Sequence, residues 1–314
     1  MGGECVLLFE RFAMRFLVVV WLLLLVMAVS WTVSGEEPAA PASLAESPPL
    51  RVMSFNIRYQ NNHDGKNGWE FRREDVAGVF RFHHVDAAGL QEAVRSQIDD
   101  LTTLLPEFAW AGAGRVDGKD DGEFTPILYR RDRLELLASG TSWLSEMPEK
   151  VGSKGWDAAL PRILTFAKFK DRQTGREWYL FNTHFDHIGV KAREESAKLM
   201  RQTIDKLPKG SAVVVTGDFN CMESSSPYKV LVETKSGDDA EFNLRDARYC
   251  SATRHHGPGT TWNGFYAAVA GQKIDHIFVN KQVSVLQHGI LADQLDDRFI
   301  SDHFPVLAEI SINK

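Results

Sequence analysis

Short apolar runs of strand length recur along the chain after residue 50 and alternate with segments of helical periodicity. Strand-like runs occupy residues 50–58, 86–92, 212–216, 273–280, 284–291 and 304–312. Residues 162–170 and 177–184 flank the sequence DRQTG, which is typical of a β-hairpin. Residues 70–83 and 191–207 place apolar side chains at helical spacing. We also predict that residues 125–130 and 133–138 form a β-pair.

This mixture of many strands with interspersed helices predicts an α/β fold. Each sheet has an apolar face to bury, so two sheets packed face to face with helices outside are the expected arrangement. The pattern continues from residue 50 to residue 314 without a second linker or an internal repeat. The sequence therefore predicts one catalytic domain over residues 50–314.

Polar residues stand at the ends of these apolar runs, where open α/β folds place functional groups. They are Asn56, Glu92, Asn182, His184, Asp218, Asn220, Asp275, Asp302 and His303. Each alone has a plainer interpretation, because Asp and Asn at strand ends commonly form turns or caps. Several motifs of fitting type in one chain favour a shared active site.

Three of these residues offer hard oxygen ligands for a metal ion. Glu92, Asn56 and Asp302 suit Mg²⁺ or Mn²⁺, whereas zinc prefers Cys and His at spacings that this chain lacks. Such an ion would polarise a phosphoryl oxygen. The sequence therefore predicts a Mg²⁺ (or Mn²⁺) site.

The remaining strand-end residues fit the hydrolysis of a phosphate ester. His303 could take a proton from water if a carboxylate such as Asp275 fixes its tautomer. Asn220, Asn182 and His184 could donate hydrogen bonds to charge that develops on phosphate.

The motifs SFNI, LQE, NTH, GDFN, IDHI and SDH, which begin at residues 54, 90, 182, 217, 274 and 301, resemble those of the endonuclease/exonuclease/phosphatase superfamily. The resemblance covers the chain after residue 50. It implies a four-layer α/β sandwich and a metal-dependent phosphoesterase. By motif, Glu92 would hold the metal near Asn56 and Asp302, while Asp275 would orient His303. Asp218 and Asn220 would position nucleophile and phosphate, with Asp218 the alternative base, and His184 would stabilise phosphoryl charge.

Segments 143–148, 155–162 and 184–189 resemble a mostly uncharacterised bacterial branch of that superfamily. We expect Arg162 and His187 to contact the substrate beyond the scissile phosphate, since arginine suits phosphate recognition. A structural ion pair is the alternative for Arg162. Trp156 and Trp262 could stack on a base or sugar, or pack in the core.

Residues 16–29 form an uninterrupted apolar run after Arg11 and Arg15. This pattern predicts a signal peptide or an N-terminal anchor within residues 1–35, followed by a Pro/Ala/Glu-rich linker over residues 36–49. We therefore expect a secreted or periplasmic protein, associated with a membrane only if residues 16–33 stay uncleaved. In such a compartment Cys221 and Cys250 could pair, but the sequence leaves their distance open.

The charge balance limits the function further. Lys and Arg number 36 against 42 Asp and Glu, for a net charge of -6, which is unusual for proteins that track nucleic acids. A phosphodiesterase or phosphomonoesterase for small or lipid-linked substrates is the favoured interpretation. A secreted nuclease is the alternative, and nucleic acid is a possible but not favoured partner. A catalytically silent binding module is disfavoured, because no member of the catalytic set is missing.

Overall fold

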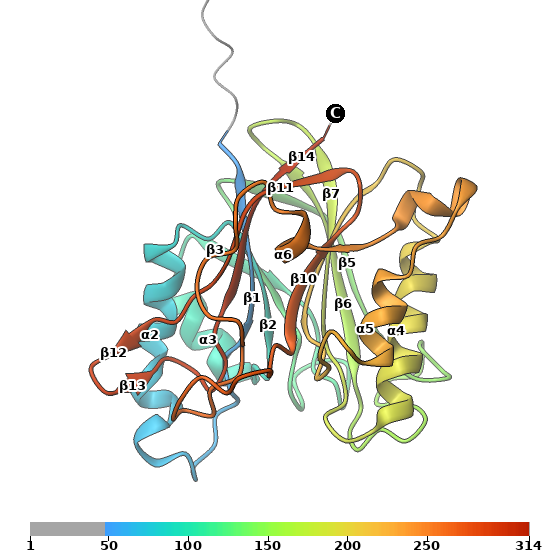
Figure 1. Cartoon of the computed structure of the whole chain (residues 1–314). Helices are drawn as coiled ribbons and strands as arrows, with labels where there is room; N and C mark the ends of the chain where they lie inside the picture. Colours follow the sequence, from blue (N-terminus) through green and yellow to red (C-terminus); the bar gives the residue numbers. More distant parts are fainter. Residues whose placement is uncertain (1–47, 314) are drawn as a thin grey trace, which may run out of the picture. The chain divides into compact units, whose positions relative to one another are not determined.

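The computed structural model describes residues 48–313, which fall in one compact unit (Figure 1). The helices are α2 (Trp69–Phe82), α3 (Arg95–Leu104), α4 (Val190–Ile204), α5 (Ser226–Val232) and α6 (Ala247–Cys250), with 3-10 turns at Gly65–Asn67 and Gly237–Phe242. Within residues 48–313, no helix combines the length and apolar character needed to cross a membrane. The predicted signal peptide or anchor, and the linker up to residue 47, lie outside the described residues.

The strands form two mixed sheets of six strands each and one small hairpin. The first sheet contains, in spatial order, β11 (Val283–Ile290), β14 (Val306–Ile312), β1 (Leu50–Asn56), β2 (Ala87–Gln91), β4 (Ile127–Arg130) and β3 (Phe108–Ala111). The second contains β5 (Leu134–Trp143), β6 (Ile163–Asp171), β7 (Glu177–His184), β8 (Ala212–Asp218), β10 (Asp275–Val279) and β9 (Arg245–Asp246). The hairpin pairs β12 (Gln294–Leu295) with β13 (Arg298–Phe299).

Each large sheet has one parallel pair at its centre, β1–β2 in the first and β7–β8 in the second. A parallel pair needs a long crossover connection, and α2 and α4 supply the two crossovers. All other neighbours within the two sheets are antiparallel. The two sheets therefore repeat one local plan.

The core is divided into three apolar clusters, one between the sheets and one under the helices on each outer face. Strand β1 shows how alternation feeds two of them: Leu50 and Val52 face the other sheet, whereas Met53 and Phe55 face α2 and α3. Figure 1 shows α2 and α3 on one side of the sheets and α4 and α5 on the other. The predicted α/β fold with two packed mixed sheets between helices is confirmed, and it has four layers.

Two local predictions have opposite outcomes. The hairpin over residues 162–184 is confirmed, and the Asp171 carboxylate caps its turn by accepting from the backbone N–H of Gln173 at 2.9 Å. The predicted β-pair of residues 125–130 with 133–138 is wrong. β4 pairs with β2 and β3, whereas β5 pairs with β6 in the other sheet. The chain crosses between the sheets at Arg133, which is buried in an ion pair with Asp171 at 3.0 Å.

Candidate active site

The topology brings the ends of several strands to one edge of the two sheets. Asn56, His184 and Asp218 are the last residues of β1, β7 and β8. Asp275 is the first residue of β10, which runs antiparallel to β8, so Asp275 lies opposite Asp218. Because the carboxyl ends of the parallel strands meet at this edge, side chains distant in sequence share one site.

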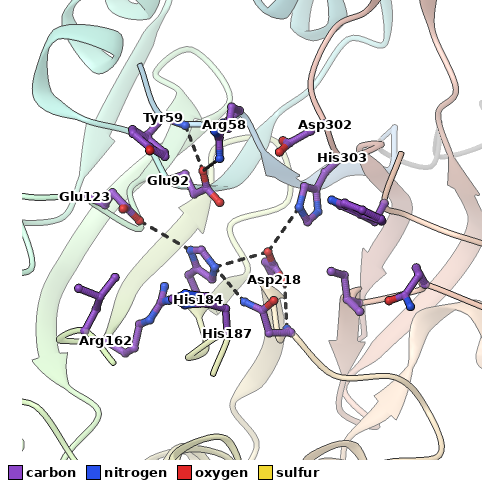
Figure 2. Close-up of a pocket in the computed structure, with 15 residues that line it drawn as sticks. Arg58, Tyr59, Glu92, Glu123, Arg162, His184, His187, Asp218, Asp302 and His303 are labelled. Carbon is purple, nitrogen blue, oxygen red and sulfur yellow. Dashed lines mark hydrogen bonds and ion pairs between the residues drawn. The ribbon is translucent and has the colours of Figure 1, made fainter. Parts of the chain in front are cut away.

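A cavity of about 650 Å³ opens at this edge. Its walls are Arg58, Tyr59, Glu92, Glu123, Leu160, Arg162, His184, His187, Asp218, Asn220, Trp262, Gln272, Ile274, Asp302 and His303 (Figure 2). Eight of the predicted site residues, together with Arg162 and His187, are thus either in these walls or one hydrogen bond behind them.

His303 lies in the loop before β14, as the sequence predicted, and its ring is held from behind. Its Nδ1 atom lies 2.8 Å from Oδ2 of Asp275, which is buried. The other ring nitrogen, Nε2, is 3.8 Å from Oδ2 of Asp218, too far for a direct hydrogen bond. The Nε2 atom is therefore left for a proton transfer in the cavity.

The charges of neighbouring side chains alter the pKa values of His303 and Asp218. Burial by itself would lower the pKa of His303, but the carboxylates of Asp275 and Asp218 outweigh it and raise the pKa well above its ordinary value. Burial, reinforced by the charge of Asp275, raises the pKa of Asp218 to about 7. The raised pKa makes the neutral His303 ring a stronger proton acceptor, and the Asp218 carboxyl can carry or release a proton near neutral pH.

Glu92 and Asp302 are two further carboxylates in the cavity lining. Glu92 adopts a left-handed backbone, with φ 64°, and its carboxylate accepts from the backbone N–H of Tyr59 at 3.1 Å. Burial raises the pKa of Asp302, an effect opposed by His303 and reinforced by the charge of Glu92. Two repelling carboxylates that face one cavity fit a divalent cation with a preference for oxygen.

Asn56 connects Glu92 with Asp218 through hydrogen bonds. Its amide nitrogen donates to Glu92 Oε1 at 3.1 Å and to Asp218 Oδ2 at 3.0 Å, both across the cavity floor. Its oxygen accepts from the backbone N–H of Arg58 at 3.0 Å, which fixes the orientation of the amide. Asn56 therefore orients Glu92 in this structure, and its role as a metal ligand stays a prediction.

Two other groups of acidic and histidine side chains lie close enough to share an ion. The first consists of Asp218, Asp275 and His303, the side chains around the proposed base that are described above. The second, Glu223, Asp246 and His276, surrounds the ammonium group of Lys273, which lies 2.8 Å from both Asp246 and His276. Glu92 and Asp302 belong to neither group and line the cavity, where Asp218 and Glu123 also present carboxylates.

His184 lies beside Asp218 (Figure 2), and the backbone N–H of Asn220 donates to Asp218 Oδ1 at 2.9 Å. The Asn220 amide nitrogen donates to the carbonyl of Phe185 and to His184 Nε2, both at 3.0 Å. The proton of the neutral His184 ring therefore sits on Nδ1. Burial lowers the pKa of His184 well below its usual range, and the charges of Arg162 and Arg115 add to the effect. The ring is neutral.

Asn182 was predicted to donate to phosphate, but the structure places it between the sheets and outside the cavity walls. Its amide nitrogen donates to the carbonyls of Leu90 and Pro126, and its oxygen accepts from Gln91 and Thr216. These four bonds use the full capacity of the side chain. Asn182 therefore has no contact here through which it would act on phosphate.

Arg162 and His187 meet at the end of the cavity away from His303 (Figure 2). Arg162 Nη2 lies 2.9 Å from His187 Nδ1, and Arg162 Nε donates to Asp186 at 3.2 Å. The structural ion pair is therefore present, and Arg162 nevertheless lines the cavity. Trp262 also lines it, whereas Trp156 does not.

Sequence reasoning missed several wall residues, among them Arg58 and Glu123. Arg58 follows Asn56 by two residues, and its φ of 57° places it in the left-handed region, which is uncommon for residues other than glycine. Glu123 had no comparable signal, because it comes from a long loop and is held by a bidentate contact with Arg115 at 2.7 and 2.8 Å. The two cysteines within residues 48–313, Cys221 and Cys250, are both free thiols, so the disulfide alternative is not realised.

Residues 53–303 match the Endonuclease/Exonuclease/phosphatase family. An endonuclease/exonuclease/phosphatase from Bacteroides vulgatus is 39% identical, over 85% of this chain and 100% of that one, with a TM-score of 0.80. A mannosyl-6-phosphatase from Bacteroides thetaiotaomicron is 36% identical, over 84% of this chain and 100% of that one, with a TM-score of 0.77. Human Nocturnin is 22% identical over 257 residues, 74% of this chain but only 56% of Nocturnin. The chain belongs to the Endonuclease/Exonuclease/phosphatase family, whose members hydrolyse phosphate esters.

Proposed function

We propose that this protein is a divalent-metal-dependent phosphomonoesterase that acts on a phosphorylated sugar or a similar polyhydroxy compound. The observation that carries the proposal is that a base and an oxygen-rich cation site line one cavity. His303, backed by Asp275, lines the same space as Glu92 and Asp302.

We assign the metal ion and the proton transfer to different residues of the cavity. Glu92 and Asp302 would hold Mg²⁺ or Mn²⁺, which when bound polarises a phosphoryl oxygen and screens its charge. His303 would take the proton of the attacking water through Nε2, while Asp275 keeps the Nδ1 proton in place. Asn220 and His184 lie beside this path and are proposed to contact the phosphate.

The end of the cavity around Arg162 suits an uncharged leaving group. The charges there are already paired, Arg162 with Asp186 and Arg115 with Glu123, so a second phosphate would find no uncompensated cation. Two buried donors, Arg162 Nη1 and His184 Nδ1, have no hydrogen-bond partner among the described residues. Such donors beside the Glu123 carboxylate suit the hydroxyl groups of a sugar.

Aromatic and aliphatic surface completes this end of the cavity. Trp262, 37% exposed, and Leu160, 38% exposed, both line it and offer apolar faces for a sugar ring. The similarity to a mannosyl-6-phosphatase supports the same substrate class. A nuclease would need several basic contacts along a phosphate chain. Here the cavity arginines Arg58 and Arg162 are paired with Asp64 and Asp186.

The apolar run over residues 16–29 is the support for a further proposal, that the chain is exported and works outside the cytoplasm. A compartment that contains extracellular phosphorylated sugars would then supply the substrate.

The decisive experiment measures hydrolysis by the full chain with Mg²⁺, with Mn²⁺ and with EDTA, as phosphate release from the monoesters, p-nitrophenol release from the diester and shortening of the oligonucleotide. Mannose 6-phosphate, glucose 6-phosphate, bis(p-nitrophenyl) phosphate and a single-stranded oligonucleotide serve as substrates. We expect turnover of the hexose phosphates, its loss in EDTA and little cleavage of the diesters. Faster cleavage of the oligonucleotide than of either hexose phosphate would instead identify a nuclease.

Arg162→Lys tests the far end of the cavity separately, because lysine keeps the charge facing Asp186 but loses the second arm of the guanidinium. The kcat/KM on a hexose phosphate should fall about tenfold more than on p-nitrophenyl phosphate, which has no ring hydroxyls. Equal losses on both substrates would remove Arg162 from sugar recognition.

A further inference from the structure

A second cluster of buried charges lies behind the active site and takes no part in the proposed chemistry. Its centre is Lys273, 5% exposed, at the start of the segment that continues into Asp275. The ammonium group lies 2.8 Å from Asp246 Oδ2, 2.8 Å from His276 Nδ1 and 3.1 Å from Glu223 Oε1. Its three protons therefore have three acceptors.

Lys273 decides which ring nitrogen of His276 carries the proton. Nζ can only donate, and it lies closer to Nδ1 than Asp246 Oδ2 does, 2.8 Å against 3.1 Å. In the contact with Lys273, Nδ1 is therefore the acceptor. The proton remains on Nε2, which faces the carbonyl of Cys221 at 3.2 Å.

That carbonyl belongs to the turn that carries the site residues Asp218 and Asn220. Asn220 has a left-handed backbone, φ 46°, which costs free energy for a residue other than glycine and must be held by its surroundings. The turn is anchored at Phe219, whose N–H donates to the carbonyl of Ile274 at 2.9 Å, and at the Cys221 carbonyl. The second anchor depends on the His276 tautomer.

We propose that Lys273 is a positioning residue: it selects the Nε2-protonated tautomer of His276, and His276 thereby fixes the turn that presents Asn220 to the phosphate. Without the ammonium group, Asp246 accepts the proton of Nδ1, and Nε2 presents a lone pair to the Cys221 carbonyl. The turn then loses an anchor beside the site. The proposal rests on the proposed hydrolysis only for its kinetic consequence.

The first test reads the tautomer directly and needs no activity. Nitrogen-15 NMR of the histidine rings, with the His276 signals assigned by their loss in His276→Gln, should show the proton on Nε2 in the wild-type protein. In Lys273→Met the proton should move to Nδ1. A wild-type ring protonated on Nδ1, or a variant ring that keeps its proton on Nε2, would overturn the proposal.

The kinetic test uses p-nitrophenyl phosphate as substrate. Lys273→Met should lower kcat about tenfold to a hundredfold with little change in KM, because a small displacement of Asn220 weakens contacts with the transition state. Adding His276→Gln to this variant should recover most of the loss, since an amide nitrogen donates without a choice of tautomer. Failure of that recovery would refute the coupling to Cys221.

A pair of single variants keeps the test usable if Lys273→Met does not fold. His276→Phe retains the ring that stacks on Phe278 at 5.4 Å but removes the donor, whereas His276→Gln retains a donor. The Phe variant should lose kcat as Lys273→Met does, and the Gln variant should stay close to wild type. Equal kcat values in the two variants would contradict the proposal, whereas an inactive wild-type protein would instead contradict the proposed function.

Discussion

The Nδ1 atom of His303 lies 2.8 Å from Oδ2 of Asp275, and both side chains are buried. The two residues come from different sheets: Asp275 opens β10, and His303 precedes β14. The carboxylate fixes the ring in one orientation and leaves Nε2 at the cavity. The distance between the sheets at this edge is therefore part of the catalytic geometry.

Replacing His303 by alanine tests the base. We expect His303→Ala to lower kcat by about 10²- to 10⁴-fold, which is the usual contribution of a positioned general base. The exposed His63 offers a matched control, and His63→Ala should keep full activity. Circular dichroism should show that both variants fold. Near-normal turnover by a folded His303→Ala protein would assign the base elsewhere, with Asp218 the first alternative.

Glu92→Gln tests the cation site by a measurement that does not depend on activity. Glutamine keeps one acceptor oxygen for the backbone N–H of Tyr59 but gives up the negative charge. Isothermal titration calorimetry should show Mg²⁺ affinity reduced at least about tenfold, as expected when a ligand charge is lost. Glu107→Gln, at an exposed position, should bind Mg²⁺ as the wild-type protein does. Equal affinities in the two variants would place the ion away from Glu92.

Gly89 makes the close approach of the two sheets possible. A Cβ atom there would lie 2.1 Å from Thr216 Oγ1 and 2.4 Å from Asn182 Oδ1, in the layer between the sheets. We expect Gly89→Ala to lower the free energy of unfolding by about 1–3 kcal/mol, the usual cost of overpacking. Gly78→Ala is the control, because a Cβ in α2 meets nothing within 4 Å and alanine favours helix. Urea denaturation that finds both variants at least as stable as wild type would contradict this account.

His288 should make folding sensitive to mild acid. Burial lowers the pKa of His288 to about 3, against about 6.5 in the unfolded chain. Its stabilisation is complete above pH 6.5. As the pH falls toward 3, the unfolded state binds a proton that the folded state excludes, so the free energy of unfolding decreases. At pH 5 the loss from this residue should be about 2 kcal/mol.

The comparison of urea denaturation at pH 7.5 and pH 5.0 isolates this effect. His288→Gln should lose less stability between the two pH values than the wild-type protein does, whereas His63→Gln should follow the wild type. Identical pH dependence in all three proteins would show that the folded protein does not exclude the proton from His288 as proposed.

The sequence determined the elements whose signals are local. The hairpin over residues 162–184 follows from turn chemistry, and the strand-end positions of Glu92, Asp275 and His303 follow from where apolar runs stop. Because strand ends collect at one edge in this class of fold, the motifs also predicted a common site.

Tertiary structure decided what depends on partners distant in the chain. Period-two alternation shows which residues of a strand share a face, but it does not show which sheet the strand joins. Strands β4 and β5 lie in different sheets although few residues lie between them in the sequence. The Asn182 side chain lies in the contact between the sheets and not in the cavity, because its four hydrogen-bond partners are buried there. Glu123 lies in the cavity wall, and Lys273 contacts Asp246 and Glu223, only because packing brings separate segments of the chain together. Hydrogen-bond partners of this kind are set by the packed core, since each buried polar group must find its bond wherever the fold places it.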